Sequence, residues 1–130
     1  MIINELNGPI INTNDIYIHD DILSVVEFDR IHKKLNLFCS KWMNRSSQYS
    51  ICFINVLGFE MTSADFWGAS ERILDFEYIK PQNRVVLPRI QKKWEQSSLP
   101  LKPSYDQYIE TLITFASGDQ LRVACESIVL

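Results

Sequence analysis

The 130-residue sequence has few of the residues that make a chain flexible or cross-linked: four glycines, five prolines and three cysteines. So few glycines and prolines argue against long linkers, and the length fits a single domain over residues 1–130. The cysteines, Cys39, Cys52 and Cys125, are odd in number and show no CxxC spacing. We interpret them as buried, reduced thiols in apolar strands, because a chain of this size can fold without a disulfide or a metal.

The sequence also lacks the signals of secretion, membrane insertion and phosphate binding. Its beginning, MIINELNGPIINTND, has no basic region, no long apolar run and no small-residue cleavage site. The longest apolar run, ICFINVLGF, is much shorter than the ~18 residues of a membrane span. Neither GxGxxG nor GxxxxGK[ST] occurs, so we expect no nucleotide cofactor. These absences and the reduced cysteines predict a cytoplasmic protein that has no membrane partner.

Basic residues are outnumbered, with 13 Lys and Arg against 16 Asp and Glu, and the net charge is −3 at pH 7. A face that binds nucleic acid needs an excess of basic residues to contact phosphates, so we expect no nucleic-acid partner. The acidic balance fits a cytosolic protein or one that meets a basic partner.

Alternating apolar and polar residues predict six or seven strands, most of them in sequential antiparallel pairs. The strand segments are 22–29, 35–43, 49–62, 72–79, 108–115 and 120–130. Short polar joints predict a hairpin at each end of this series, and Gly118 suits the second turn. Apolar residues on both faces of segment 49–62 indicate a central strand, in which Gly58 predicts a bulge or a bend.

One helix is predicted at about residues 88–97, where Pro88 suits the first turn and Ile90 and Trp94 share one face. The fold class is therefore mainly β or α+β: an antiparallel curved sheet, or a two-sheet sandwich, with one helix on part of one face. Strand alternation further predicts which side chains point inward. In segment 35–43 one face carries Leu35, Leu37, Cys39 and Met43, and in segment 72–79 the inward residues are Leu74, Phe76 and Tyr78.

The tripeptide His19-Asp20-Asp21 is the segment with most resemblance to a chemical site. Imidazole and carboxylate groups can share a metal ion or transfer a proton. Neighbours in an extended chain point to opposite sides, however, and no HxH, HxxE or CxxC spacing supplies a third ligand. The alternative is that His19 or Asp20 bonds to nearby backbone where the chain enters its first long strand.

A pair of carboxylates offers a second route to catalysis. Asp75 and Glu77 lie two residues apart on one strand face, which places their side chains about 6–7 Å apart. That spacing is compatible with a glycosidase, although any solvated strand face with two acids shows it as well. We favour the solvated face, and the sequence predicts no catalytic, cofactor-binding or metal-binding residue.

The segment from Gly58 to Ile79 combines acids with aromatic side chains. Its acids outnumber its one base, Arg72, and a basic stretch from Lys80 to Lys93 follows. Such a segment can bind a basic protein partner, or it can be a solvated region that keeps the sheet from pairing with others. Phe66 and Trp67 either cap the core or act as anchors. The candidate partner-binding residues are Glu60, Asp65, Phe66, Trp67, Glu71, Asp75 and Glu77.

Three segments share features with a known group of proteins: IHDDILSVVEFDRIHKKLNLFC, INVLGFEMTSADFWGASERILDFEY and ITFASGDQLRVACESIVL. Together they resemble small, poorly characterised bacterial proteins, some of which are encoded beside polymorphic or contact-dependent toxins and are regarded as immunity proteins. The resemblance spans most of the chain, except residues 80–104, and it supplies no active-site residues. It implies a cytosolic protein that binds and neutralises a cognate toxin domain.

The first hypothesis is therefore a non-enzymatic bacterial binding protein, immunity-like, that occludes an active or essential surface of a toxin. The second is a structural or housekeeping interaction domain, in one form a homodimer joined through a sheet edge. An enzymatic function is the third and least supported.

Overall fold

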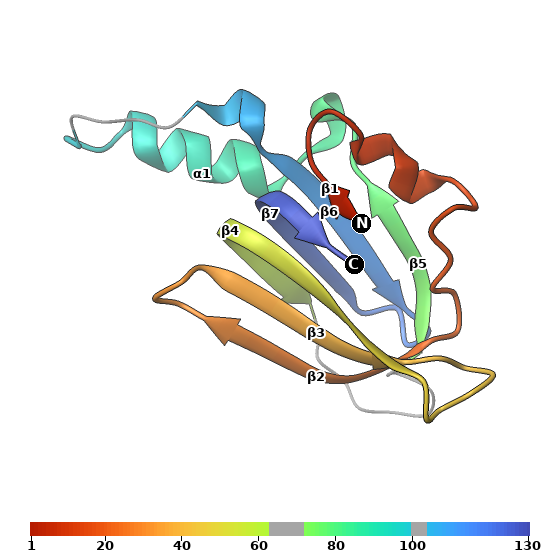
Figure 1. The fold of residues 1–130 in the computed structure, drawn as a ribbon. Coiled ribbons are helices and arrows are strands. Elements are labelled where there is room, and N and C mark those ends of the chain that lie inside the picture. Colours follow the sequence, from red (N-terminus) through yellow and green to blue (C-terminus); the bar gives the residue numbers. More distant parts are fainter. Residues whose placement is uncertain (63–71, 100–103) are drawn as a thin grey trace.

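The computed structural model describes residues 1–62, 72–99 and 104–130. Its strands are β1 (Ile2–Ile3), β2 (Ile22–Asp29), β3 (Lys34–Ser40), β4 (Gln48–Thr62), β5 (Ile73–Tyr78), β6 (Ile109–Phe115) and β7 (Gln120–Val129). Its helices are α1 (Val86–Glu95) and the short 3-10 turns η1 (Gly8–Asn12), η2 (Pro81–Asn83) and η3 (Tyr105–Gln107). The strands form one open antiparallel sheet in the order β2-β3-β4-β7-β6-β5, and β1 pairs with β7 (Figure 1). The predicted fold class is confirmed, as a single sheet.

The predicted hairpins are confirmed as β2–β3 and β6–β7. The second predicted strand ends earlier than expected, at Ser40. Met43 therefore lies in the loop before β4 with 90% of its surface exposed, and its predicted place on one strand face with Leu35, Leu37 and Cys39 was wrong. The alternation that predicted it holds only as long as the strand continues, and Lys41 already bonds to Ser47 in the loop.

The two faces of the sheet are covered by different segments. The N-terminal segment contributes Ile3, Ile11 and Ile18 to the larger core cluster, which also holds Val123 and Cys125 of β7. Ala124 points the other way, as strand alternation requires, and packs with residues of α1. Ala124 thus belongs to a second, smaller core cluster, to which α1 contributes Val86 and Leu87, with Ile90 packed against them. The sheet thus has an N-terminal-segment side and a helix side (Figure 1).

Gly58 allows α1 to lie close to the sheet. The pairing of β4 with β7 shifts between Val56 and Gly58, so the predicted bulge is confirmed. A β-carbon on Gly58 would lie 2.6 Å from Cδ1 of Ile90. A larger residue at this position would therefore require the Ile90 side chain to move away from β4.

A second bulge changes the faces of β5. The pairing of β5 with β6 shifts between Ile73 and Asp75, which leaves Leu74 as the extra residue. Leu74 is consequently 48% exposed, so its predicted inward orientation was wrong. Ile73 fills the core in its place, while Phe76 is buried as predicted.

Helix α1 begins at Val86, two residues before its predicted start, and its N-terminus is capped from the sheet. The N-cap residue is Val85, whose apolar side chain cannot accept a hydrogen bond from the helix. Glu110 of β6 does so instead: its Oε2 accepts the Val85 N–H at 2.8 Å and its Oε1 accepts the Leu87 N–H at 2.7 Å. Its side chain is fully buried, and Nη1 of Arg122 lies 3.6 Å from Oε2. A carboxylate in this position complements the positive end of the helix dipole.

We predict that Glu110→Gln lowers the free energy of unfolding by about 1.5–3 kcal/mol, because one charge-assisted acceptor is lost and a buried N–H is left without a partner. Urea unfolding would measure the loss, and amide hydrogen exchange in α1 would accelerate more than exchange in β6. Glu5→Gln, at an exposed position, is the matched control and should change stability by less than about 0.5 kcal/mol. Equal effects of the two substitutions would contradict the capping role.

Candidate functional site

Cross-strand pairing brings two of the predicted partner-binding acids into one row. Glu60 on β4 lies opposite Arg122 on β7. Arg122 lies opposite Leu112 on β6, which in turn lies opposite Glu77 on β5. Residues directly opposite each other in a sheet point to the same face. Glu60 and Glu77 therefore share a face although three strand pairings separate them.

Asp75 belongs to the next row of the same face. It lies opposite Thr114, which pairs with Gln120, which pairs with Thr62. We call the surface formed by these two rows the acidic face. It lies on the helix side of the sheet, because the neighbouring row contains Ala124, which packs against α1.

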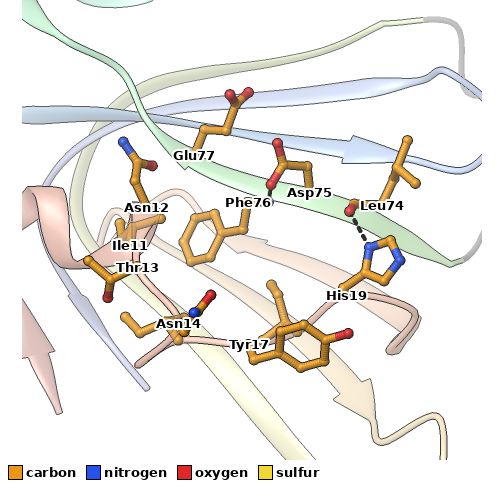
Figure 2. A pocket seen from close by; sticks show the side chains of 12 residues that line it. Ile11, Asn12, Thr13, Asn14, Tyr17, His19, Leu74, Asp75, Phe76 and Glu77 are labelled. Carbon is orange, nitrogen blue, oxygen red and sulfur yellow. Dashed lines mark hydrogen bonds between the residues drawn. The ribbon is translucent and has the colours of Figure 1, made fainter.

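The three acids differ in how far they are already engaged. Glu60 accepts a hydrogen bond from Nη1 of Arg89 at 2.5 Å and lies 4.0 Å from Nε of Arg122. Asp75 is exposed and, among the described residues, accepts only the neighbouring Phe76 N–H, at 2.9 Å (Figure 2). Glu77 makes no hydrogen bond or ion pair with any described residue. Asp75 and Glu77 are therefore the carboxylates that a cation from outside can reach.

Figure 2 shows both carboxylates on the opposite side of β5 from the Phe76 ring, so their predicted outward orientation is confirmed. An open groove of about 390 Å³ runs between β5 and residues 11–19 of the N-terminal segment. Asn12 closes one end of the groove like a neighbouring strand residue, donating to the Tyr78 carbonyl and accepting its N–H. The segment that follows leaves β5 and returns at His19.

His19 and Asp20 hold the N-terminal segment against the start of β5. The Nδ1–H of His19 donates to the Leu74 carbonyl at 2.6 Å, and Nε2 lies 3.5 Å from the Asp20 carboxylate. Asp20 in turn forms an ion pair with Arg72, and its N–H donates to the Ile73 carbonyl at 2.7 Å. Bonding of His19 to backbone was one of the two readings of this tripeptide, although the carbonyl lies 55 residues away rather than nearby.

Asp21 has a separate and equally complete set of partners. Its buried carboxylate accepts hydrogen bonds from Nζ of Lys41 at 3.2 Å, the Trp42 N–H at 3.1 Å and the Tyr49 hydroxyl at 2.6 Å. The pKa of the Tyr49 hydroxyl is well above its ordinary value, first because of burial and second because of this bond. Among residues 1–62, 72–99 and 104–130, no group of three or more His, Cys, Asp or Glu side chains could hold a metal ion.

The remaining predicted residues, Asp65, Phe66, Trp67 and Glu71, lie outside the described residues. The sequence reasoning missed Arg122 and Glu110, which place positive and negative charge within or beside the acidic face. The sequence did contain a pattern that could have identified them, because each is a charged residue within a strongly apolar strand. A buried charge in such a place requires partners.

The cysteines follow their predicted burial at two of three positions. Cys39 and Cys125 are buried, whereas Cys52 is only half-buried, and all three are free thiols. Burial raises the pKa of Cys39 to about 11 and raises that of Cys125 as well. The pKa of Cys52 is also raised by its partial burial.

No protein-family model and no curated protein matches this sequence. A crystal structure of an uncharacterized protein from Neisseria gonorrhoeae is similar in outline, with a TM-score of 0.48 and 18% sequence identity. The match covers 99% of this chain and 95% of that chain. Similarity at this level indicates nothing about function. No helix in the described part of the chain is long and apolar enough to cross a membrane.

We predict that Asp21→Asn destabilises the fold by roughly 1.5–3 kcal/mol, because an amide cannot accept from Lys41, Trp42 and Tyr49 as a carboxylate does. Thermal and urea unfolding would measure the loss. The exposed Asp15→Asn is the control and should leave stability within about 0.5 kcal/mol of the original protein. An unchanged midpoint in Asp21→Asn would contradict a structural role for this carboxylate.

We also predict an order of thiol reactivity. At pH 8 a thiol with a pKa of about 11 carries about a hundredfold less thiolate than one at the ordinary value, and burial blocks its access to reagent. Iodoacetamide should therefore modify Cys52 first, and Cys39 and Cys125 only after unfolding. Mass spectrometry of peptides from a time course would show the order, and rapid labelling of native Cys39 would refute it.

Proposed function

We propose that this protein is a non-enzymatic binding protein of the bacterial cytoplasm, immunity-like, that neutralises a cognate toxin by covering an active or essential surface. The observation that carries the proposal is the position of Glu60, Asp75 and Glu77 on one face of the sheet. All three belong to the set that the sequence alone selected for partner binding.

The chemistry of the acidic face favours a basic partner. Asp75 and Glu77 have carboxylates available to Lys or Arg side chains of a toxin domain. Charges of opposite sign at an interface raise the rate of encounter and fix the orientation of the two proteins. Glu60 contributes to the same field but is partly neutralised by Arg89, so it ranks below the two acids of β5.

The proposed mode of action is occlusion, in which the acidic face covers a surface of the toxin. The acids of this face are carried by strands of a hydrogen-bonded sheet. A sheet supports its side chains on a rigid backbone, so little order has to be created on binding. The tripeptide His19-Asp20-Asp21 also favours a non-enzymatic function. His19, Asp20 and Asp21 each bond to backbone or to an ion-pair partner within the chain, which gives them a structural task. The three free thiols fit a reducing compartment.

The direct test is co-expression with the product of the neighbouring gene, followed by purification of the complex. We expect that product to arrest growth when expressed alone and to be tolerated when this protein is present. Growth that does not depend on this protein would contradict the proposal. A purified protein that binds no such neighbour would favour the alternative, a structural interaction domain.

A charge-neutralised variant tests the proposed surface. Asp75→Asn combined with Glu77→Gln should weaken binding of the partner about 10- to 100-fold, mainly through a slower association rate that depends on salt. The matched control is Glu5→Gln combined with Asp106→Asn, which removes two exposed acids elsewhere. Surface plasmon resonance at two salt concentrations would compare them. Equal losses for both double variants would place the contact outside the acidic face.

A further inference from the structure

The outer hairpin carries an unusual group of exposed apolar side chains. Val25 and Phe38 are 47% and 39% exposed, and Val26 and Phe28 are each 39% exposed. Ile31, at the tip of the hairpin, is more exposed still. Single exposed apolar residues are common on protein surfaces, but a contiguous group indicates an interaction surface.

Three of these residues lie on the edge strand β2, and they point to both faces of the sheet. Val26 and Phe28 lie opposite Leu37 and Leu35, which belong to the larger core. Val25 lies opposite Phe38 and therefore points to the other face. Both faces of β2 thus remain partly open at its edge. A strand added beside β2 would cover apolar side chains on both faces at once.

Counting only described residues, the edge of β2 has no partner along most of its length. Within the described residues, β2 pairs with β3 on one side, and its other side makes a single bridge, between Ile22 and Arg72. A bulge at Ser24 follows, and the pairing from Val25 to Asp29 is then regular. Bulges and charged residues commonly protect edges from unwanted pairing. Here the bulge protects only the first part of the strand.

We propose that Ser24–Phe28 joins the same stretch of a second copy of this chain, in an antiparallel pairing that continues the sheet across a two-fold axis. A two-fold axis perpendicular to the sheet pairs residues of the same face. With Glu27 on the axis, its carboxylate would lie opposite the Glu27 carboxylate of the other copy. With Phe28 on the axis, Glu27 would face Asp29 of the other copy. Like charges directly opposite each other are destabilising.

With Val26 on the axis, no acid faces another acid. Val26 then lies opposite itself, and Glu27 lies opposite Val25 of the other copy. Ser24, the bulged residue, then lies opposite Phe28 of the other copy, at the end of the pairing rather than at its centre. Asp29 is occupied in the turn, where it accepts from the Ile31 and His32 N–H groups at 3.1 Å. Repulsion between acids therefore disfavours an axis at Glu27 or Phe28, and the bulge at Ser24 disfavours an axis nearer the start of the strand.

Charge also favours an antiparallel over a parallel arrangement. Antiparallel pairing brings the basic hairpin tip of one copy, with Arg30 and Lys33, toward the start of β2 in the other, where Asp20 and Asp21 lie. These acids already hold Arg72 and Lys41, so the added attraction is small. A parallel arrangement would place the two basic tips side by side.

The proposed dimer is independent of the acidic face. Strand β2 is at one edge of the sheet, and Asp75 and Glu77 are on β5 at the other edge (Figure 1). Pairing through β2 therefore leaves both acidic faces accessible. Loss of the dimer and loss of partner binding would result from different substitutions, so the two proposals can fail separately.

Size-exclusion chromatography with light scattering of the full chain, over a wide range of concentrations, tests the dimer. We expect the mass of two chains, and the mass of one chain for Val26→Lys, in which two lysines would face each other across the axis. Circular dichroism would show that this variant is folded. The matched control is Leu74→Lys, on the edge strand β5 with 48% exposure, which should remain dimeric. A single-chain mass for the unmodified protein, or an unchanged dimer in Val26→Lys, would overturn the proposal.

A cysteine cross-link tests the register independently of stability. Opposite residues in an antiparallel pair have Cα atoms about 4.5–5.5 Å apart, which is within the range that a disulfide spans. Val26→Cys should therefore form a covalent dimer under mild oxidation, at least about tenfold faster than Leu74→Cys or the unmodified protein. Non-reducing gel electrophoresis would follow the rate. Equal rates for the two cysteine variants would show that Val26 does not lie on the axis.

Discussion

The bond between the Glu110 carboxylate and the first amides of α1 determines how the helix side of the sheet is divided. The helix has no acidic residue in its first turn and no capping side chain of its own, so its positive end is complemented from β6. This contact, together with the space that Gly58 provides for Ile90, holds α1 over one end of that face. Arg89 of the helix still reaches Glu60, whereas Asp75 and Glu77 on β5 bond to no described residue of α1. The acidic face exists because the helix is held where it is.

Carboxylates in this fold are of two kinds: buried ones that hold parts of the chain together, and accessible ones that a partner can contact. Glu110 and Asp21 are buried, and each accepts at least two hydrogen bonds that include backbone N–H groups. Such groups connect parts of the chain that are distant in sequence, since Asp21 joins the N-terminal segment to β4 and the loop before it. Asp75 and Glu77 lie outside these networks, on an edge strand. An acid with no internal task and access to water is free to take a partner from solution, which is why the two acids of β5 matter more than Glu60.

Alternation in the sequence predicted the strands well because most of them follow a regular pleat for their whole length. It failed where the pleat is interrupted: an extra residue in β5 turned Leu74 outward, and the early end of β3 left Met43 in a loop. The outward orientation of Asp75 and Glu77 was predictable from their own strand. Their convergence with Glu60 was not, because it depends on β7 and β6 lying between β4 and β5, an order that no local pattern encodes.

The same strand order explains why one small sheet can offer two separate surfaces. The chain places its first long strand, β2, at one edge and inserts β7 and β6 between β4 and β5, so the two edges are formed by strands far from each other. At the β5 edge the N-terminal segment supplies Asn12 and His19 as substitutes for a neighbouring strand. At the β2 edge no such substitute is present in the described residues beyond Ile22. An edge that the chain covers can carry exposed charge, whereas an edge that it leaves open and apolar gains most from another strand.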